Sequence, residues 1–319
     1  MATKKIKVIL DSNVWRYVVD VQEQDHLRTI AMQSKYQILV PPALVYEAAS
    51  LQNQALRKKI IDLLTAPYWK RLMPEAFSEC EEVRSEIARL RPTWLKPNPN
   101  RQWFKRIRYD WLRSNGGFWD RIRNPSEELL ELTAAPKRNE AIFENSKLSR
   151  AWGIENEKHW KNVDFSNLRV YEMGRANPAP NFEVWRFDTF KAFENTIYDQ
   201  EHAYFEWLAW AIDFDSMLSD TSMRSFWLYE IASSKMPRNW IRSAMNYRQS
   251  FNKVNRGSGA DNQIATYLID ADLFISADAG FAAQVEHLAY EAPVGITVAA
   301  AKKISGGRDG VEQLFDILS

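Results

Sequence analysis

The sequence has little cysteine, little glycine, no long apolar run and almost no net charge. Of 319 residues one is cysteine, Cys80, which excludes a disulfide framework and any multi-cysteine zinc or iron–sulfur site. Eleven glycines argue against a glycine-rich dinucleotide loop. No apolar stretch reaches the length of about 18 residues that a membrane span needs, and the N-terminus turns polar too early for a signal segment, so we expect a soluble, cytoplasmic protein. Lys and Arg (42) balance Asp and Glu (41), so no overall field indicates a polyanionic partner.

Tryptophan is abundant by contrast, and it is concentrated in the middle of the chain. Eleven of the 13 tryptophans lie between Trp94 and Trp240. The length fits about two domains and a large core. This uneven distribution indicates that the middle of the chain differs in character from its two ends.

The two ends of the sequence alternate short apolar runs with helical patterns. Alternation of this kind predicts βαβ units and a parallel sheet. The expected strands are Lys5–Leu10, Tyr36–Val40, Leu273–Ser276 and Val294–Ala299. The expected helices are Asp25–Ser34, Ala43–Leu51, Glu75–Leu90, Asp261–Ile269, Phe281–Ala289 and Gly310–Leu318.

Residues 92–255 carry helical patterns only. Asn124-Pro125 resembles a helix start, and longer helices are expected over Asp188–Ile212 and Pro237–Val254. The sequence therefore predicts one α/β domain, built from residues 1–91 and 256–319, that is interrupted by an all-helical insertion of residues 92–255.

Four carboxylates fall where one edge of the expected sheet would gather them. Asp11 and Asp278 follow the ends of two strands, Glu47 lies one turn into a helix, and Asp261 opens another helix. Ligands bind at the carboxyl ends of parallel strands, and clustered carboxylates repel one another unless a cation neutralises them. Oxygen ligands without His or Cys favour Mg²⁺ or Mn²⁺. Taken singly, Asp11 and Asp261 also fit helix caps, Glu47 a solvated helix face and Asp278 a turn.

The same carboxylates stand in segments that resemble the motifs of PIN-domain nucleases. VILDSNVW at 8–15 resembles the opening motif of that family, and PPALVYEAA at 41–49 resembles the second. ADNQIATYLIDADLFISADAGF at 260–281 resembles the third and fourth together. The resemblance covers residues 1–91 and 256–319 and does not extend to the insertion, which is far longer than the usual connection.

The resemblance implies a three-layer α/β/α fold and a divalent-metal phosphodiesterase that acts on RNA or, less often, on DNA. It implies that Asp11, Glu47, Asp261 and Asp278 bind one or two Mg²⁺ or Mn²⁺ ions, which activate water and stabilise charge on the phosphate. Asn13 and Ser276 would orient a carboxylate or a water. For Asn13 a simple helix-start hydrogen bond is an equal alternative.

Two parts of the insertion are locally basic and contain aromatic residues, as in grooves that hold single-stranded nucleic acid. In the basic part at residues 235–256, Arg238 and Arg242 lie one helical turn apart, and Arg256 precedes Asp261. The other basic part, between residues 96 and 123, includes Arg101, Lys105, Arg106 and Arg108. Most of the aromatic residues fit the core of the insertion equally well. An acidic stretch at 194–220 would repel nucleic acid, and it also fits a solvated face or a protein contact.

The sequence therefore predicts a metal-dependent endonuclease, with RNA favoured over DNA, and a toxin-like or defence role is compatible with it. A catalytically silent PIN-fold module that binds nucleic acid or protein is the main alternative, and an enzyme of small phosphorylated substrates is a third. The pattern leaves open an inhibitory protein partner, the oligomeric state and the sequence preference.

Overall fold

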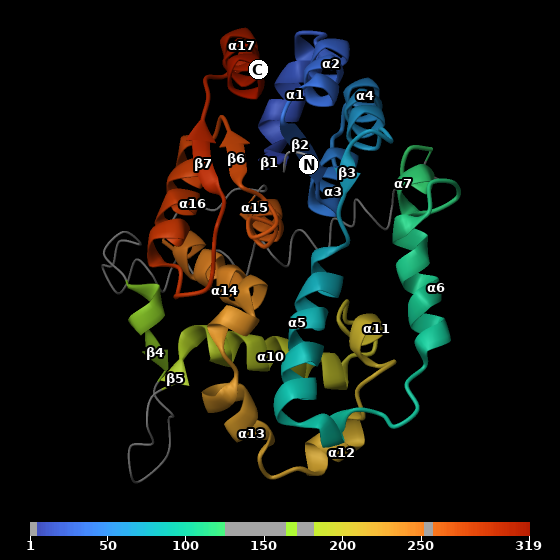
Figure 1. The fold of residues 1–319 in the computed structure, drawn as a ribbon, viewed down its shortest axis with the longest axis vertical. Helices are drawn as coiled ribbons and strands as arrows, with labels where there is room; N and C mark the ends of the chain where they lie inside the picture. Colours follow the sequence, from blue (N-terminus) through green and yellow to red (C-terminus); the bar gives the residue numbers. More distant parts are fainter. Residues whose placement is uncertain (1–4, 125–163, 171–181, 252–257) are drawn as a thin grey trace.

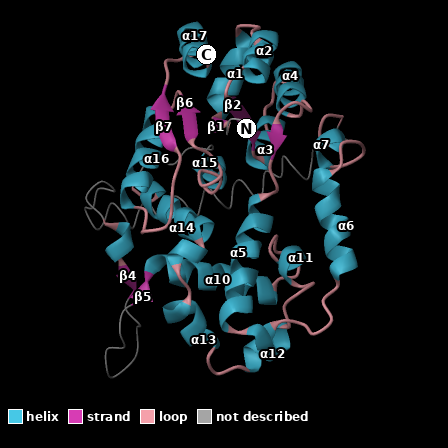
Figure 2. Cartoon of the chain, in the orientation of Figure 1, coloured by secondary structure: helices cyan, strands magenta, loops and turns pink. Residues whose placement is uncertain are grey.

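The computed structural model describes residues 5–124, 164–170, 182–251 and 258–319 (Figure 1). Its centre is a five-stranded sheet in the order β3-β2-β1-β6-β7, in which every neighbouring pair is parallel. The chain therefore has an α/β fold with many helices around one parallel sheet (Figure 2). The strands of this sheet are β1 Ile6–Leu10, β2 Tyr36–Val40, β3 Lys70–Arg71, β6 Leu273–Ser276 and β7 Ala300–Lys303.

The inner strands form because their apolar runs are buried on both faces of the sheet. In β1 the last three residues are fully buried, and β2 and β6 end on buried runs in the same way. Val8 pairs with Ile38 on one side and with Leu273 on the other. These registers bring the carboxyl ends of β1, β2 and β6 to one edge of the sheet.

The strand order reverses beside β1, which fixes where a ligand site is expected. From β1 the chain proceeds outward through β2 to β3, and it later returns to the other side of β1 with β6 and then β7. In open parallel sheets, ligands bind outside the carboxyl ends of the strands at such a reversal. Here the reversal lies between β1 and β6.

Helices connect the strands of the N-terminal half largely as the sequence predicts. The expected helices over Asp25–Ser34, Ala43–Leu51 and Glu75–Leu90 are confirmed with small changes of boundary. An additional helix, α4, was not expected; Asn53 begins it by accepting a hydrogen bond from the Leu56 amide. The bounds are α1 Ser12–Asp20, α2 Gln24–Gln33, α3 Pro42–Ala49, α4 Gln54–Leu64 and α5 Glu75–Leu90.

The described part of the middle segment is not all-helical, which corrects the sequence-based prediction. Arg169–Val170 (β4) and Phe182–Glu183 (β5) form a short antiparallel pair. Strands of two residues are too short to show an alternating pattern, so the sequence carries no signal for them. The expected helix start at Asn124-Pro125 leads into residues outside the described part of the chain. The other elements are η1 Pro92–Trp94, α6 Arg101–Leu112, α7 Phe118–Arg121, η3 Phe165–Asn167, α10 Val184–Tyr198, α11 Phe205–Leu208, α12 Phe214–Ser219, α13 Met223–Ser225, η4 Phe226–Glu230, η5 Ser233–Lys235 and α14 Pro237–Gln249.

The helix expected over Asp188–Ile212 is broken in the structure. α10 ends at Tyr198, and the side chain of Asp199 accepts a hydrogen bond from the Glu201 amide in the following turn. Asp side chains compete in this way with the helical backbone pattern. The aromatic spacing that suggested one helix is thus divided between α10 and α11.

The C-terminal helices are present with shifted boundaries, α15 ending at Ala265 rather than at Ile269, and the last strand departs from the prediction. α15 is Ser258–Ala265, α16 is Ala279–Glu291 and α17 is Gly307–Leu318. The strand expected at Val294–Ala299 is wrong, because β7 comes later and pairs Ala300 with Leu273. Gly295 has a positive φ of 95° and Val294 is 99% exposed, so residues 294–295 form a turn, and residues 296–299 have no regular secondary structure.

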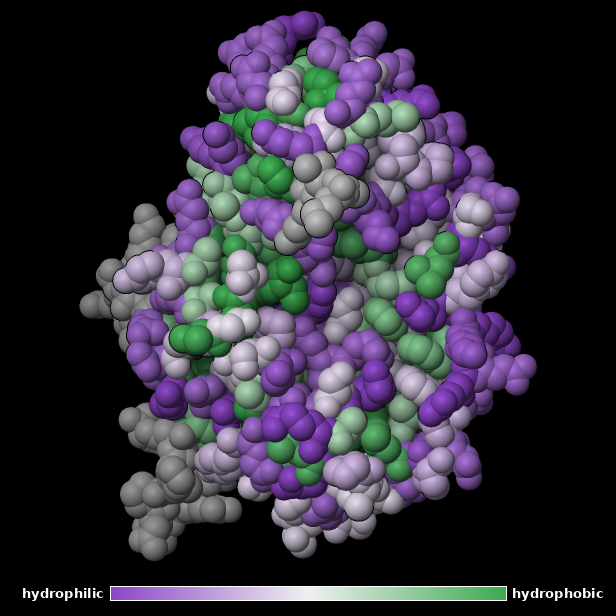
Figure 3. Space-filling model, in the orientation of Figure 1, coloured by the Kyte–Doolittle hydropathy of each residue, from purple (hydrophilic) through white to green (hydrophobic). Residues whose placement is uncertain are grey.

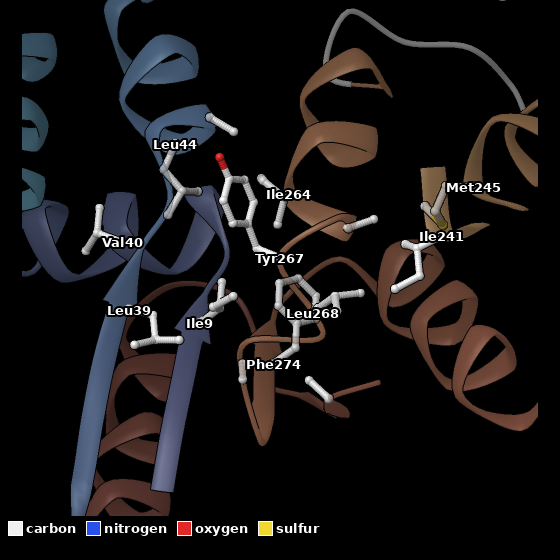
Figure 4. Packing of buried hydrophobic residues seen from close by; sticks show 14 of the residues in the cluster. Ile9, Leu39, Val40, Leu44, Ile241, Met245, Ile264, Tyr267, Leu268 and Phe274 are labelled. Atoms are coloured by element: carbon white, nitrogen blue, oxygen red, sulfur yellow. The ribbon is translucent and has the colours of Figure 1, made fainter. Parts of the chain in front are cut away.

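One hydrophobic cluster connects the α/β part with the middle segment. Ile241 and Met245 of α14 belong to the same cluster as Phe274, which is part of β6, and Leu268, which precedes that strand (Figure 4). α14 packs against α5, α15 and α16. Buried residues of the α/β part and of the middle segment therefore belong to one cluster. Within the described residues, no helix combines the length and apolar character that crossing a membrane requires.

Candidate active site

Two aspartates stand at the ends of the neighbouring strands β1 and β6. Asp11 follows β1 and is 3% exposed, and its Oδ1 accepts a hydrogen bond from the Ser12 amide at 2.7 Å, which caps α1. Asp278 follows β6 and caps α16 by accepting from the amides of Gly280 (2.7 Å) and Phe281 (2.9 Å). Both aspartates are thus helix caps and also flank the reversal of strand order. In both aspartates, the capping hydrogen bonds use one of the two carboxylate oxygens.

Asn13 and Ser276 connect these two strand ends. Asn13 Nδ2 donates to Asp11 Oδ2 at 2.8 Å, while its Oδ1 accepts from the Ala277 amide at 3.1 Å. The Ser276 hydroxyl donates to Asp11 Oδ2 and accepts from the Asp278 amide at 2.9 Å. These bonds fix the orientation of the Asp11 carboxylate. The sequence predicts that Asn13 and Ser276 orient a carboxylate or a water.

Glu47 and Asp261 approach from the two helices beside this edge. Glu47 is half-buried on α3, and its Oε1 accepts from the Ser12 hydroxyl at 3.0 Å. Its Oε2 is shielded from solvent and has no hydrogen-bond partner among the described residues. Asp261 lies in the first turn of α15. Because α15 packs against α3, the two carboxylates lie on adjacent helices.

The four carboxylates act on one another electrostatically. Burial raises the pKa of Asp261 well above its usual value, and the charges of Asp11, Glu47 and Asp278 raise it further. Burial, with the charge of Asp11, raises the pKa of Glu47 to about 7, against the hydrogen bond from Ser12. Burial raises the pKa of Asp11 despite its three hydrogen bonds, and Asp278 adds to the shift. The charged groups that shift these three pKa values most are themselves carboxylates.

The donor set suits a hard divalent cation, but the side chains as placed do not form a ready coordination group. Carboxylate oxygens are the ligands that Mg²⁺ and Mn²⁺ take, and the unpaired Oε2 of Glu47 is available to such an ion. Across the described ranges, no set of three or more His, Cys, Asp or Glu side chains is close enough to hold a metal ion. The residue types therefore suit such an ion, whereas their placement in the described residues does not bring three of them together.

A cavity of about 190 Å³ opens beside Glu47, between α1, α3 and α4. Ser12, Asn13 and Glu47 line one part of it, and aliphatic side chains such as Leu44 and Leu64 line the rest. The acidic edge of the sheet therefore borders an apolar space. Sequence reasoning did not identify Ser12 or this cavity, although Ser12 stands inside the DSN motif that it singled out.

The basic residues expected on α14 are engaged within the protein. Arg238 is half-buried and makes a bidentate pair with Asp270, at 2.8 Å to each oxygen, and it also approaches Glu82 at 3.7 Å. Arg242 Nε lies 2.6 Å from Oε1 of Glu79, which is fully buried. Neither arginine is free for phosphate, and neither pairs with the acidic stretch at 194–220. The third expected residue, Arg256, lies outside the described residues.

The basic residues expected near residue 100 lie on an exposed helix instead. Asn100 begins α6 by accepting from the Trp103 amide at 3.1 Å. Phe104 stacks on Trp210 with ring centroids 4.3 Å apart, and Trp111 stacks on Phe118 at 4.1 Å, which attaches one face of α6 to the protein. The helix lies at the edge of the molecule, where polar side chains dominate the surface (Figure 3). Its exposed cations, which form no ion pair with any described residue, are Arg101, Lys105, Arg106 and Arg108.

Comparison of the chain with protein-family models, with curated proteins and with solved structures finds no match.

Proposed function

We propose that this chain is a divalent-metal-dependent nuclease of PIN-like, three-layer α/β/α architecture, and that RNA is its preferred substrate. The observation that carries the proposal is the mutual effect of four carboxylates at the reversal of strand order, with no described cation among them. Such a cluster is costly for the fold, because like charges in a desolvated site disfavour ionisation. The proposed reaction and the proposed preference for RNA are based on the resemblance of the same segments to PIN-domain motifs.

The residues of the site have distinct tasks in this proposal. Asp11, Glu47, Asp261 and Asp278 would hold one or two Mg²⁺ or Mn²⁺ ions. A bound ion would supply Lewis acidity toward water and toward the scissile phosphate. Asn13 and Ser276 hold the Asp11 carboxylate in place through their hydrogen bonds to Oδ2. Asp278 keeps one oxygen on the start of α16, so its second oxygen would bind the cation.

α6 is the surface that we expect to contact the nucleic acid backbone. Its four exposed cations match a polyanion, and exposed Tyr109 (61%) offers a ring on which a base can stack. The helix is also connected to the acidic site. Trp111 stacks on Phe118, whose centroid lies 5.6 Å from that of Tyr46, the residue before Glu47. A strand that follows α6 toward α7 would therefore arrive beside α3.

A second candidate function is a PIN-like module that binds nucleic acid without cleaving it. One observation favours it, namely that the described acidic side chains do not stand in coordination geometry. Both functions predict binding along α6. They differ in whether a divalent cation makes the bound strand break.

A cleavage assay with isosteric variants separates the two functions. Labelled RNA, single-stranded DNA and double-stranded DNA are incubated with the purified protein in Mn²⁺, Mg²⁺ or EDTA. We expect cleavage of RNA that requires the cation and falls by orders of magnitude in Asp278→Asn. This variant removes a charge but keeps a helix-capping side chain, so the fold survives. Binding without cleavage under all conditions would support the silent module and contradict the nuclease.

A further inference from the structure

The cavity beside Glu47 combines an apolar interior with a polar edge. Leu44 and Ala48 of α3 line it on one side and Leu64 of α4 on the other. Asn13 and Glu47 line the part next to the carboxylates, and the exposed side chain of Arg16 lies at its rim. Ser12, Asn13 and Glu47 therefore belong both to the lining of this cavity and to the site described above.

Its size suits one planar ring. An apolar cavity of about 150 Å³ accepts a benzene molecule. The volume here is about 190 Å³, which leaves room for the substituents of a heterocyclic base. Ligand sites have the same general composition, with mostly apolar walls and a few polar groups that fix orientation.

We propose that this cavity is a nucleobase subsite, in which one base of the substrate strand inserts while its phosphate lies at the carboxylates. This inference rests on the proposed function. Arg16, whose guanidinium is planar, would cover the inserted base at the rim. The aliphatic side chains of α3 and α4 would contact its faces. The base thereby holds the neighbouring phosphodiester in register with Asp11 and Glu47.

Binding of single-abasic oligonucleotides tests the subsite without depending on catalysis. Fluorescence anisotropy in Ca²⁺, which neutralises the carboxylates, measures the affinity of the full chain for a labelled oligocytidylate RNA and for the same strand with one base removed at each position in turn. Wild-type protein should lose about tenfold in affinity at one position, the order expected for losing one stacked base. Ala48→Leu and Ala48→Phe fill the cavity in two steps and should lower affinity for the intact strand in the same order.

The matched control and the abasic strand distinguish the outcomes. Ala55→Phe places the same ring at an exposed position of α4 away from the cavity and should bind like wild type. On the most sensitive abasic strand, Ala48→Leu and wild type should bind equally. The subsite is overturned if every abasic strand binds alike, or if filling the cavity weakens intact and abasic strands equally. Those results leave the proposed nuclease intact, whereas absence of any RNA binding overturns both.

Discussion

At the scale of single residues, Glu79 and Glu82 of α5 stabilise α14 through an ion pair and hydrogen bonds. Glu79 is fully buried and has Arg242 as its ion-pair partner, and the Tyr204 hydroxyl donates a hydrogen bond to it. Glu82 accepts from the amides of Arg238, at 3.1 Å, and of Asn239, at 3.3 Å. A carboxylate of α5 thus satisfies the first free amides of α14. These contacts join the middle of the chain to the helix that precedes it.

Removal of Arg242 should therefore destabilise the protein strongly. Arg242→Met leaves the Glu79 carboxylate buried without its countercharge, and breaking a buried pair in this way costs about 3–5 kcal/mol. Chemical denaturation should show a free energy of unfolding lowered by that amount. The double variant Glu79→Gln/Arg242→Met should recover much of the loss, because Gln still accepts from Tyr204. Equal stability of wild type and Arg242→Met would refute this role of the pair.

A second prediction at this scale concerns pH. Burial raises the pKa of Glu82 to about 8, although Arg238 and the amides of α14 act in the opposite direction. A carboxyl whose pKa is higher in the folded state contributes stability at low pH and loses it as the pH rises through the folded pKa. We expect Glu82→Gln to lose less stability than wild type between pH 5 and pH 9. The slopes should differ by at most about 1.4 kcal/mol per pH unit.

Denaturation at several pH values measures this difference. The matched control is Glu81→Gln on the same helix, whose carboxylate pairs with Arg84 at 2.7 Å in a partly exposed position. That variant should follow the wild-type slope. If Glu82→Gln also follows the wild-type slope, Glu82 does not bind a proton on folding in this pH range.

At the scale of elements, α6 is the surface on which nucleic-acid binding depends. Charge reversal at Lys105, Arg106 and Arg108 should weaken binding of single-stranded RNA and flatten its salt dependence by roughly 0.7 in log–log slope for each phosphate that the helix no longer neutralises. The melting temperature should not change, because all three side chains are exposed and unpaired with described residues. Reversal of exposed Lys5 and Lys35, which precede β1 and β2 at the opposite edge of the sheet, serves as the control and should leave binding close to wild type. An unchanged salt slope after reversal on α6 would remove this helix from the binding surface.

The sequence predicts those elements whose signal is local. β1, β2 and β6 are apolar runs that end in turn signals, and their positions are correct. β7 has the sequence AAKK, which does not favour strands, and forms because its backbone pairs with β6. The preceding apolar run has the composition of a strand but consists of a turn and irregular backbone. Pairing across the sheet decides between the two segments, and pairing is not encoded in local propensity.

The same distinction applies to the candidate site. The carboxylates and their partners stand in short motifs next to strand ends, so the sequence places Asp11, Asn13 and Ser276 correctly relative to one another. Exposure of an arginine depends instead on residues far away in the chain. Arg238 reaches Asp270 and Arg242 reaches Glu79, and no spacing within α14 predicts either contact. The sequence contains two basic segments, which form α14 and α6 in the structure. Local patterns do not show which of the two is exposed to solvent.

At the scale of the whole molecule, the carboxylate cluster should limit stability when no divalent cation is present. Asp261 carries the repulsion of Asp11, Glu47 and Asp278 in addition to its burial. Asp261→Asn should therefore raise the melting temperature in EDTA, by about 2–4 °C for each kcal/mol of repulsion relieved in a large domain. Wild-type protein should gain stability with millimolar Mn²⁺ by linkage, about 2.7 kcal/mol at a hundredfold excess over Kd, and the variant should gain less.

The control for this prediction is Asp316→Asn on α17, an aspartate remote in sequence from the four motifs. It should leave the melting temperature in EDTA and the response to Mn²⁺ as in wild type. If Asp261→Asn and wild type melt alike with and without Mn²⁺, the carboxylates do not repel one another enough to matter.

The proposed nuclease depends on the four carboxylates binding a divalent cation, and calorimetric titration with Mn²⁺ measures this most directly. Wild-type protein should bind one or two Mn²⁺ ions with a saturable heat. Asp278→Asn should weaken that binding by tenfold or more, the order of about 1.4 kcal/mol or above, while its melting curve remains cooperative. Saturable binding in wild type that disappears in the variant is the predicted result. Absence of saturable binding in wild type, or equal binding in Asp278→Asn, would contradict the assignment.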